Sequence, residues 1–157
     1  MQNILMAVFA ALVLATDQIT KLLTVVNIQL GGTVAAIPGL FSLTYVRNTG
    51  AAWSSFEGQH WLFALVFAAF AAFILWEFPK KRLGFKSFER WCLVSVFAGG
   101  LGNMIDRLRL GFVVDMIRLD FMNFPVFNVA DCFISCGCVL LILHLMLCNK
   151  EFWKDKK

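Results

Sequence analysis

Four long stretches without a charged side chain dominate this sequence. They cover residues 1–16, 60–76, 91–105 and 132–149. Each stretch, extended by its flanks, approaches the roughly 20 residues that an α-helix needs to cross the hydrocarbon core of a membrane. The stretches are continuously apolar and do not alternate with polar residues, which disfavours a membrane β-barrel. We therefore predict an all-α polytopic membrane protein with four transmembrane helices, near residues 3–25, 60–78, 90–108 and 130–148.

The overall composition agrees with a membrane protein. Of 157 residues, 60% are hydrophobic and 15% are charged, whereas about 25% are charged in a typical soluble domain. So few polar side chains cannot cover the surface of a soluble fold of this size. The prolines lie outside the predicted spans, as an uninterrupted helical backbone in lipid requires; they are Pro38, Pro79 and Pro125. No linker or repeat interrupts the chain, so we expect one membrane-embedded domain over residues 1–157.

The distribution of basic residues predicts the orientation in the membrane. Five lysines and arginines lie between the second and third predicted spans and four lie in residues 150–157, which makes nine of 14. By the positive-inside rule, both termini are cytoplasmic and residues 26–59 and 108–129 face outward. The net charge of +4 is then a topology signal, and no nucleic-acid partner is expected. The first span has no basic residues before it, so we expect it to be retained and not cleaved as a signal peptide.

The two outward segments differ in character. Residues 26–59 contain Gly-Gly, Pro-Gly and Asn-Thr-Gly turn signals around an alternating run at residues 41–46. This pattern predicts a small β-structured extracytoplasmic loop that lies on the membrane surface. Residues 108–129 contain two short apolar segments, and each of them ends at a polar residue.

Polar side chains gather at the outer ends of the predicted spans. Polar groups at membrane depth are costly and are functional candidates by default. Each also has a structural interpretation. Asp17 and Lys21 have the spacing of a helical ion pair whose lysine reaches the surface, Asp131 is a helix N-terminal acid, and Asp106 ends a span. The full group is Asp17, Lys21, Asn48, Gly50, Asn103, Asp106, Arg107, Asp115, Asn128 and Asp131. Because all of them are expected at the outer membrane interface, we interpret the group as a functional site.

Asp115 and Asp131 stand out because each follows apolar residues and has no obvious neutralising neighbour. Two carboxyls in a low-dielectric setting share a proton, so the pair can act as base and acid in turn. This is the chemistry of aspartic proteolysis, which needs no metal or cofactor, and we expect none. The cysteines lack metal-ligand spacing and are expected to pack as small apolar residues. Spacing alone does not show that Asp115 and Asp131 meet.

Two other functions remain open at this point. A small four-span transporter could use Asp17 and Lys21 for a coupling ion, but it predicts charges near the bilayer midplane and an inverted repeat. Neither feature is visible in the sequence. A non-catalytic membrane assembly protein would be indifferent to loss of either Asp115 or Asp131.

Five short motifs occur in a fixed order, at residues 17–21, 47–52, 99–107, 113–115 and 127–131. Together they resemble the signature motifs of the bacterial lipoprotein signal peptidase family (signal peptidase II), which are four-span aspartic proteases of the inner membrane. The resemblance covers about residues 15–135. There are two departures: Met116 stands where an aromatic residue is expected, and Cys132 where a small hydroxyl residue is common.

The resemblance implies roles for individual residues. Asp115 and Asp131 fall on the catalytic pair. Positions that bind substrate or support the pair are Asp17, Lys21, Asn48, Gly50, Asn103, Arg107, Asn128 and Ala130. The implied substrate is a prolipoprotein whose cysteine carries diacylglyceryl, cut on the amino side of that cysteine, and globomycin is the expected inhibitor. We expect Trp53 and Phe56 to clamp the substrate, and the glycines near Gly100 to let helices approach closely.

Overall fold

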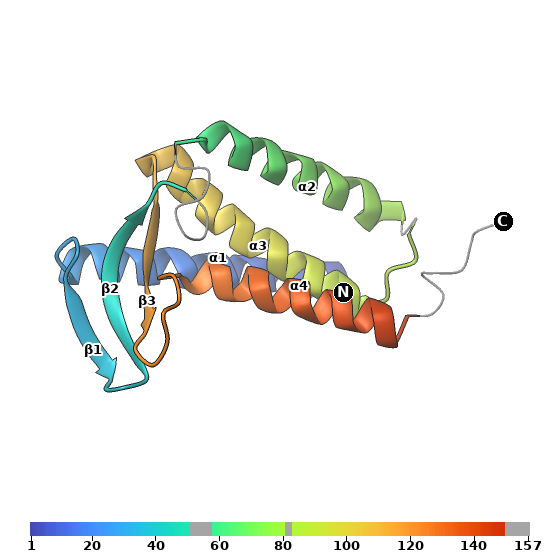
Figure 1. The fold of residues 1–157 in the computed structure, drawn as a ribbon. Helices are drawn as coiled ribbons and strands as arrows, with labels where there is room; N and C mark the ends of the chain where they lie inside the picture. The colour runs from blue at the N-terminus through green and yellow to red at the C-terminus, as the bar shows by residue number, and fades with distance from the viewer. Residues whose placement is uncertain (51–57, 81–82, 150–157) are drawn as a thin grey trace.

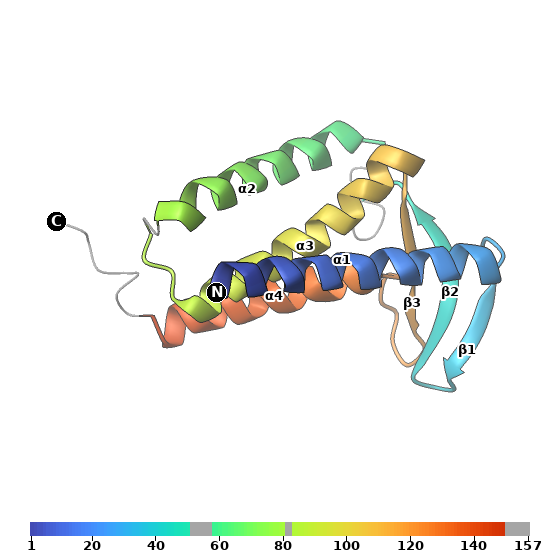
Figure 2. The same ribbon diagram turned by 180° about the vertical axis from the view of Figure 1, so that it is seen from behind.

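The computed structural model describes residues 1–50, 58–80 and 83–149 of the 157-residue chain. Four helices form a bundle, and a small sheet lies across one end of it (Figures 1 and 2). The elements, in chain order, are α1 (Gln2–Asn27), β1 (Thr33–Ile37), β2 (Phe41–Asn48), α2 (His60–Lys80), α3 (Ser87–Leu110), β3 (Val113–Leu119) and α4 (Val129–Leu147). The sheet lies at the end of the bundle where α1 ends and α4 begins.

Within the described residues, three helices are long and apolar enough to cross a membrane: Gln2–Asn27, Trp61–Pro79 and Val129–Leu147. They correspond to three of the four predicted spans. The remaining prediction, at residues 90–108, falls on α3, which is long enough but less apolar, since its glycines, Asn103 and the pair Asp106–Arg107 lower its hydropathy. α3 packs against α1, α2 and α4. A helix that is covered by its neighbours need not be apolar all round.

One detail of the predicted spans is wrong. Pro79 was expected to follow the second span, but it is the penultimate residue of α2, which continues to Lys80. A proline removes one backbone hydrogen bond and its ring crowds the carbonyl four residues earlier, and here the helix ends one residue later. Arg90 also donates from Nη2 to the carbonyl oxygen of Phe78 at 3.1 Å, which satisfies an acceptor at this helix end.

The sheet is antiparallel, with the order β1-β2-β3. β2 confirms the strand predicted from the alternation at residues 41–46. β3 was not predicted, because Val113–Leu119 alternates poorly; it becomes a strand by pairing with β2, where Val46 lies opposite Asp115. Strands from the two segments that were predicted to face outward therefore pair in one sheet, and β3 carries Asp115 into it.

Glycines allow close contact between helices, as expected. A Cβ atom on Gly99 would lie 2.5 Å from the carbonyl oxygen of Ala130, and one on Gly102 would lie 2.5 Å from Asp17 Oδ2. On Gly137 it would lie 2.9 Å from Val96 Cγ2. These separations are below van der Waals contact, so α3 can approach α1 and α4 this closely only without side chains at these positions.

Gly99→Ala is expected to destabilise the protein by about 1–3 kcal/mol, because the new methyl group meets the backbone of α4 and forces the helices apart. The thermal unfolding midpoint in detergent measures this effect. Gly100→Ala is the matched control, since its Cβ would meet only the ring of Phe67, at 3.2 Å. Equal midpoints for the two variants would contradict the steric argument.

Candidate active site

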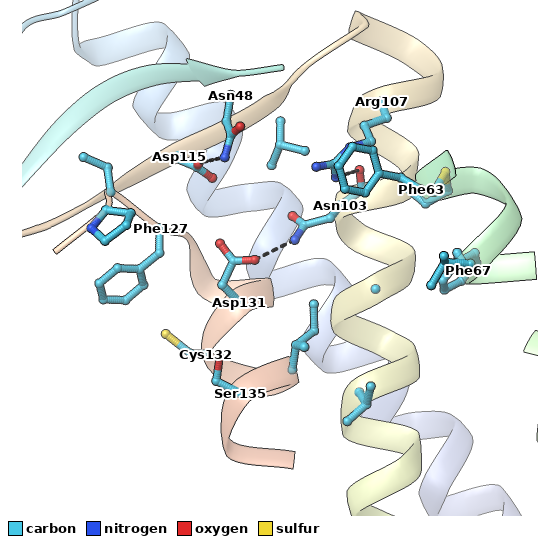
Figure 3. A pocket seen from close by; sticks show the side chains of 18 of the residues that line it. Asn48, Phe63, Phe67, Asn103, Arg107, Asp115, Phe127, Asp131, Cys132 and Ser135 are labelled. Carbon is cyan, nitrogen blue, oxygen red and sulfur yellow. Dashed lines mark hydrogen bonds between the residues drawn. The ribbon is translucent and has the colours of Figure 1, made fainter. Parts of the chain in front are cut away.

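Asp115 and Asp131 both line a cavity of about 810 Å³ between α2, α3, α4 and β3 (Figure 3). Asp115 comes from β3, and Asp131 comes from the first turn of α4. Aromatic side chains of α2, among them Phe63 and Phe67, form much of the opposite wall. The tertiary structure therefore brings together the two carboxyls that sequence spacing left apart.

Asn128 connects the two carboxyls. It is completely buried. Its Nδ2 donates to Asp115 Oδ1 at 2.6 Å, and its backbone N–H donates to Asp131 Oδ2 at 3.1 Å. Its Oδ1 in turn accepts from the backbone N–H of Asp131 at 3.0 Å, which completes a reciprocal cap at the start of α4. The expectation that Asp131 is a helix N-terminal acid is confirmed, and the same cap fixes its position beside the cavity.

Two further amides orient the carboxyls. Asn48 donates from Nδ2 to Asp115 Oδ2 at 2.9 Å, and Asn103 donates from Nδ2 to Asp131 Oδ1 at 2.8 Å (Figure 3). The Oδ1 of Asn103 accepts from Lys21 at 2.9 Å and from Asn128 at 3.1 Å. These two donors fix which way the Asn103 amide faces, so its NH2 group points to Asp131.

The environment of Asp115 changes its acidity. The pKa of Asp115 is raised to about 7, chiefly by burial. The hydrogen bond from Asn48 lowers this pKa, and the charge of Asp131 raises it. A carboxyl with this pKa keeps its proton up to neutral pH. It can then donate a proton to a reacting group while its partner accepts one.

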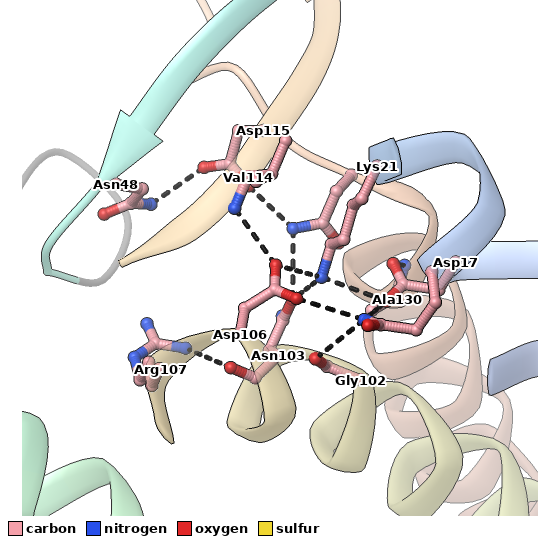
Figure 4. A network of polar contacts seen from close by, with 12 residues as sticks. Asp17, Lys21, Asn48, Gly102, Asn103, Asp106, Arg107, Val114, Asp115 and Ala130 are labelled. Carbon is pink, nitrogen blue, oxygen red and sulfur yellow. Dashed lines mark hydrogen bonds and ion pairs between the residues drawn. The ribbon is translucent and has the colours of Figure 1, made fainter. Parts of the chain in front are cut away.

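A buried ion cluster lies beside the carboxyls (Figure 4). Lys21 Nζ lies 3.0 Å from Asp17 Oδ2 and 3.0 Å from Asp106 Oδ2. The predicted Asp17–Lys21 pair is confirmed. The structural interpretation, in which Lys21 reaches the surface, is wrong, since the residue is 3% exposed. Asp106 and Asn103 hold the ammonium inside, and these partners offset the cost of desolvating it.

Asp17 and Ala130 join α1 to α4. The backbone N–H of Ala130 donates to Asp17 Oδ1 at 3.0 Å (Figure 4). This is one of the N–H groups in the first turn of a helix that lack a partner within the helix. The contact fixes the start of α4, one residue before Asp131, against α1.

Arg107 and Gly50 meet at the cavity rim. Arg107 donates from Nη2 to the carbonyl oxygen of Gly50 at 2.7 Å, and its guanidinium lies 4.2 Å from the centre of the Phe63 ring. Gly50 donates its N–H to Asn48 Oδ1 at 2.9 Å, and Asn48 in turn donates to Asp115, so the rim is linked to the catalytic pair. Trp53 and Phe56, the expected substrate clamp, lie outside the described residues.

Gln18 and Phe63 contribute to the site and were not among the candidates from the sequence, and Asp106, which was a candidate, was assigned no role in it. Asp106 Oδ2 accepts from the backbone N–H of Val114 at 3.1 Å, next to Asp115. Gln18 donates to Asp106 Oδ1 at 3.1 Å. Asp106 lies three residues after Asn103, on the same helix face, and this spacing could have indicated that Asp106 belongs to the site. The sequence holds no such signal for Phe63, because an apolar cavity wall and a lipid-facing side chain have the same composition.

Comparison with known proteins gives a consistent result. Residues 9–147 match the family model for signal peptidase (SPase) II. The lipoprotein signal peptidase of Lactococcus lactis subsp. lactis (strain IL1403) is 44% identical over 154 residues, which cover 96% of this chain and 99% of that protein. The lipoprotein signal peptidase of Enterococcus faecalis (strain ATCC 700802 / V583) is 45% identical over 150 residues, which cover 94% and 91% of the two chains.

Solved structures agree as well. One bacterial membrane enzyme superposes with a TM-score of 0.85 at 30% identity, covering 97% of this chain and 93% of that chain. A second superposes with a TM-score of 0.80 at 31% identity, covering 91% and 93%. Fold, sequence and the paired carboxyls therefore lead to one conclusion: the chain belongs to the signal peptidase II family of membrane peptidases.

Proposed function

We propose that this peptidase removes the signal peptide from prolipoproteins whose cysteine carries diacylglyceryl, and that it cuts on the amino side of that cysteine. One observation carries the proposal: Asp115 and Asp131 line the same cavity, which is otherwise mostly apolar. An apolar signal helix with an acyl anchor needs such a cavity, with the hydrolytic groups at its polar end. The names of the relatives, lipoprotein signal peptidase, support the substrate class.

In the proposed mechanism, Asp131 is the base and Asp115 is the acid. Asp131 takes a proton from water, whose oxygen forms a bond to the scissile carbonyl carbon. Asp115, which keeps its proton because of its raised pKa, donates that proton to the carbonyl oxygen, which gives a tetrahedral intermediate with two hydroxyl groups. As the C–N bond breaks, one of these hydroxyl groups returns a proton to Asp115 and becomes the new carbonyl oxygen. The leaving nitrogen receives the proton that Asp131 took. Asn48, Asn103 and Asn128 hold the two carboxyls, and Arg107 with Gly50 binds the substrate backbone at the rim.

The proposed setting is the inner membrane of a bacterium. All four helices, α3 included, span the bilayer as one domain over residues 1–157, with both termini cytoplasmic and the sheet and cavity at the outer face. Nine of the 14 lysines and arginines lie in residues 80–90 and 150–157 of the sequence, at or after the ends of α2 and α4 that are far from the sheet, which supports this orientation. Membrane lipids surround the bundle, and a globomycin-type inhibitor is expected to occupy the cavity.

A cleavage assay tests the proposed function. The purified protein in lipid vesicles is given a synthetic prolipoprotein with a diacylglyceryl cysteine, or the same chain with an unmodified cysteine. We expect mass spectrometry to find a product that begins at the modified cysteine, and no product from the unmodified chain. Equal cleavage of both substrates, or a cut elsewhere, would overturn the substrate assignment.

The pH dependence of cleavage is a further prediction. Because the acid form of Asp115 is needed, kcat/KM is expected to fall about tenfold per pH unit above an apparent pKa of about 7. Initial rates between pH 5 and 9 measure this alkaline limb of the pH profile, the range in which kcat/KM falls. The hydrogen bond from Asn48 lowers the pKa of Asp115, so Asn48→Leu is expected to move the limb to higher pH. A limb that moves to lower pH in this variant would contradict the role of Asp115 as the acid.

A further inference from the structure

A second pocket of about 340 Å³ lies behind the catalytic segments. Its walls come from the C-terminal half of α1, from β2 and β3, and from the first residue of α4. Met116, which lines it, directly follows Asp115, and Val129 lies two residues before Asp131. Met116 and Ile117 of β3 both line this pocket, whereas Val113 and Asp115 line the catalytic cavity, so an occupant of the pocket touches β3 directly after Asp115.

The polar side chains of this pocket each donate to a backbone carbonyl oxygen of α1. Thr20 donates from Oγ1 to the carbonyl oxygens of Thr16 and Asp17, both at 2.9 Å. Thr24 donates to the carbonyl oxygen of Thr20 at 2.9 Å, and Asn27 donates from Nδ2 to that of Leu23 at 2.7 Å. The other lining residues are apolar, and a mostly apolar cavity does not hold water well. The chemistry of the walls therefore selects a hydrocarbon.

The mouth of the pocket joins the lipid-facing surface of α1. Leu23 lines the pocket and is 55% exposed, and its neighbours Leu22 and Val26 are 62% and 71% exposed. α1 is long and apolar enough to cross a membrane. In a membrane peptidase, such an apolar helix surface lies against acyl chains. The pocket is thus an inward extension of a surface that lipid covers.

We propose that this pocket binds an acyl chain of a membrane phospholipid, which packs against Met116 and Val129 behind the two aspartates. The proposal goes beyond the cleavage reaction and rests on the membrane setting, not on the roles of Asp115 and Asp131. The volume lies at the lower end of the range for ligand pockets, roughly 300–1,000 Å³. One chain, and not a whole lipid, is therefore the occupant.

Photo-crosslinking tests the proposal. The full-length protein is placed in vesicles of phosphatidylcholine that carries a diazirine near the end of one acyl chain, and adducts are mapped by mass spectrometry. Met116 is the reporter because it lines this pocket and is only 2% exposed, so lipid outside the pocket does not reach it. We expect adducts on Met116 in the wild type and equally in Asp115→Asn. This second result separates lipid binding from the proposed catalytic role.

A pair of neighbouring variants supplies the control. Leu23→Trp places a large ring at the pocket mouth, whereas Leu22→Trp changes an exposed residue outside the lining. We expect Leu23→Trp to lower the Met116 adducts about tenfold, by displacing a few methylene groups of the chain. Leu22→Trp is expected to leave them unchanged, and adducts on exposed Leu12 serve as the internal standard.

Three outcomes would overturn the proposal. The first is an absence of adducts on Met116 in the folded wild-type protein. The second is an equal loss in Leu22→Trp and Leu23→Trp, which would show only general lipid contact. The third is loss of the Met116 adducts on addition of a diacylglyceryl substrate peptide but not of unlabelled phosphatidylcholine, which would assign the pocket to the substrate.

Discussion

Replacing either Asp115 or Asp131 by asparagine is expected to lower the rate of prolipoprotein cleavage by at least about 10⁴-fold, with the folded protein still in the membrane. An amide can neither take a proton from water nor donate one as a carboxylic acid does, so each variant lacks one half of the proton transfer. Because the two carboxyls act as a unit, the double variant is expected to lose little more than either single variant.

The measurement is single-turnover cleavage of the lipid-modified substrate, with thermal unfolding as the check on folding. Asp120→Asn is the matched control. Asp120 follows β3 and contacts Ser42 and Arg118, and it does not line the catalytic cavity. Its variant is expected to retain nearly full activity. Cleavage near the wild-type rate in Asp115→Asn or Asp131→Asn would refute the catalytic assignment.

Lys21→Met is expected to lower the free energy of unfolding by about 3–5 kcal/mol, because it leaves buried carboxylates without their cation. Lys21 is the shared partner of Asp17 and Asp106, which come from α1 and α3. Its Nζ also donates to Asn103. The loss therefore loosens the junction of α1 and α3, and it frees the Asn103 amide that faces Asp131. A denaturant titration of the protein in detergent measures this loss of stability.

A double variant tests the electrostatic cause. In Lys21→Met/Asp106→Asn, one of the two stranded carboxylates is neutralised, while the asparagine oxygen still accepts from the N–H of Val114. We expect part of the lost stability to return, as a coupling energy in a double-mutant cycle. Lys86→Met is the control for loss of a lysine, since Lys86 donates to the carbonyl oxygen of Cys148 in an exposed contact. A loss in Lys21→Met no larger than in Lys86→Met would contradict the buried ion cluster.

Local sequence signals predicted the helices and one strand well. Apolar runs mark α1, α2 and α4, because lipid imposes the same apolar requirement on every side of a spanning helix. The alternation at residues 41–46 marks β2. Two other features follow from contacts with neighbouring elements. β3 forms by pairing with β2, and α3 can have a low hydropathy because other helices cover it. A strand that carries Asp115 is stable only when paired, and a helix enclosed by three others is not selected for lipid contact.

In the site, too, the sequence indicated some features and the tertiary structure was needed for others. The order of the five motifs indicated which side chains belong to it, and the scarcity of charge made Asp115 and Asp131 conspicuous. Asp106 also stood in a motif. Its structural interpretation as the end of a span concealed its contacts with Lys21 and Val114.

The sequence by itself determined that this chain belongs in a membrane and which carboxyls are available, because hydropathy and residue type are local properties. Only the tertiary structure decided that Asp115 and Asp131 share a cavity, that Asn128 bridges them, and that Lys21 stays buried. These facts depend on helices that touch at Gly99 and Gly102, far from both carboxyls in sequence. Contacts between distant segments set burial, and burial raises the pKa of Asp115.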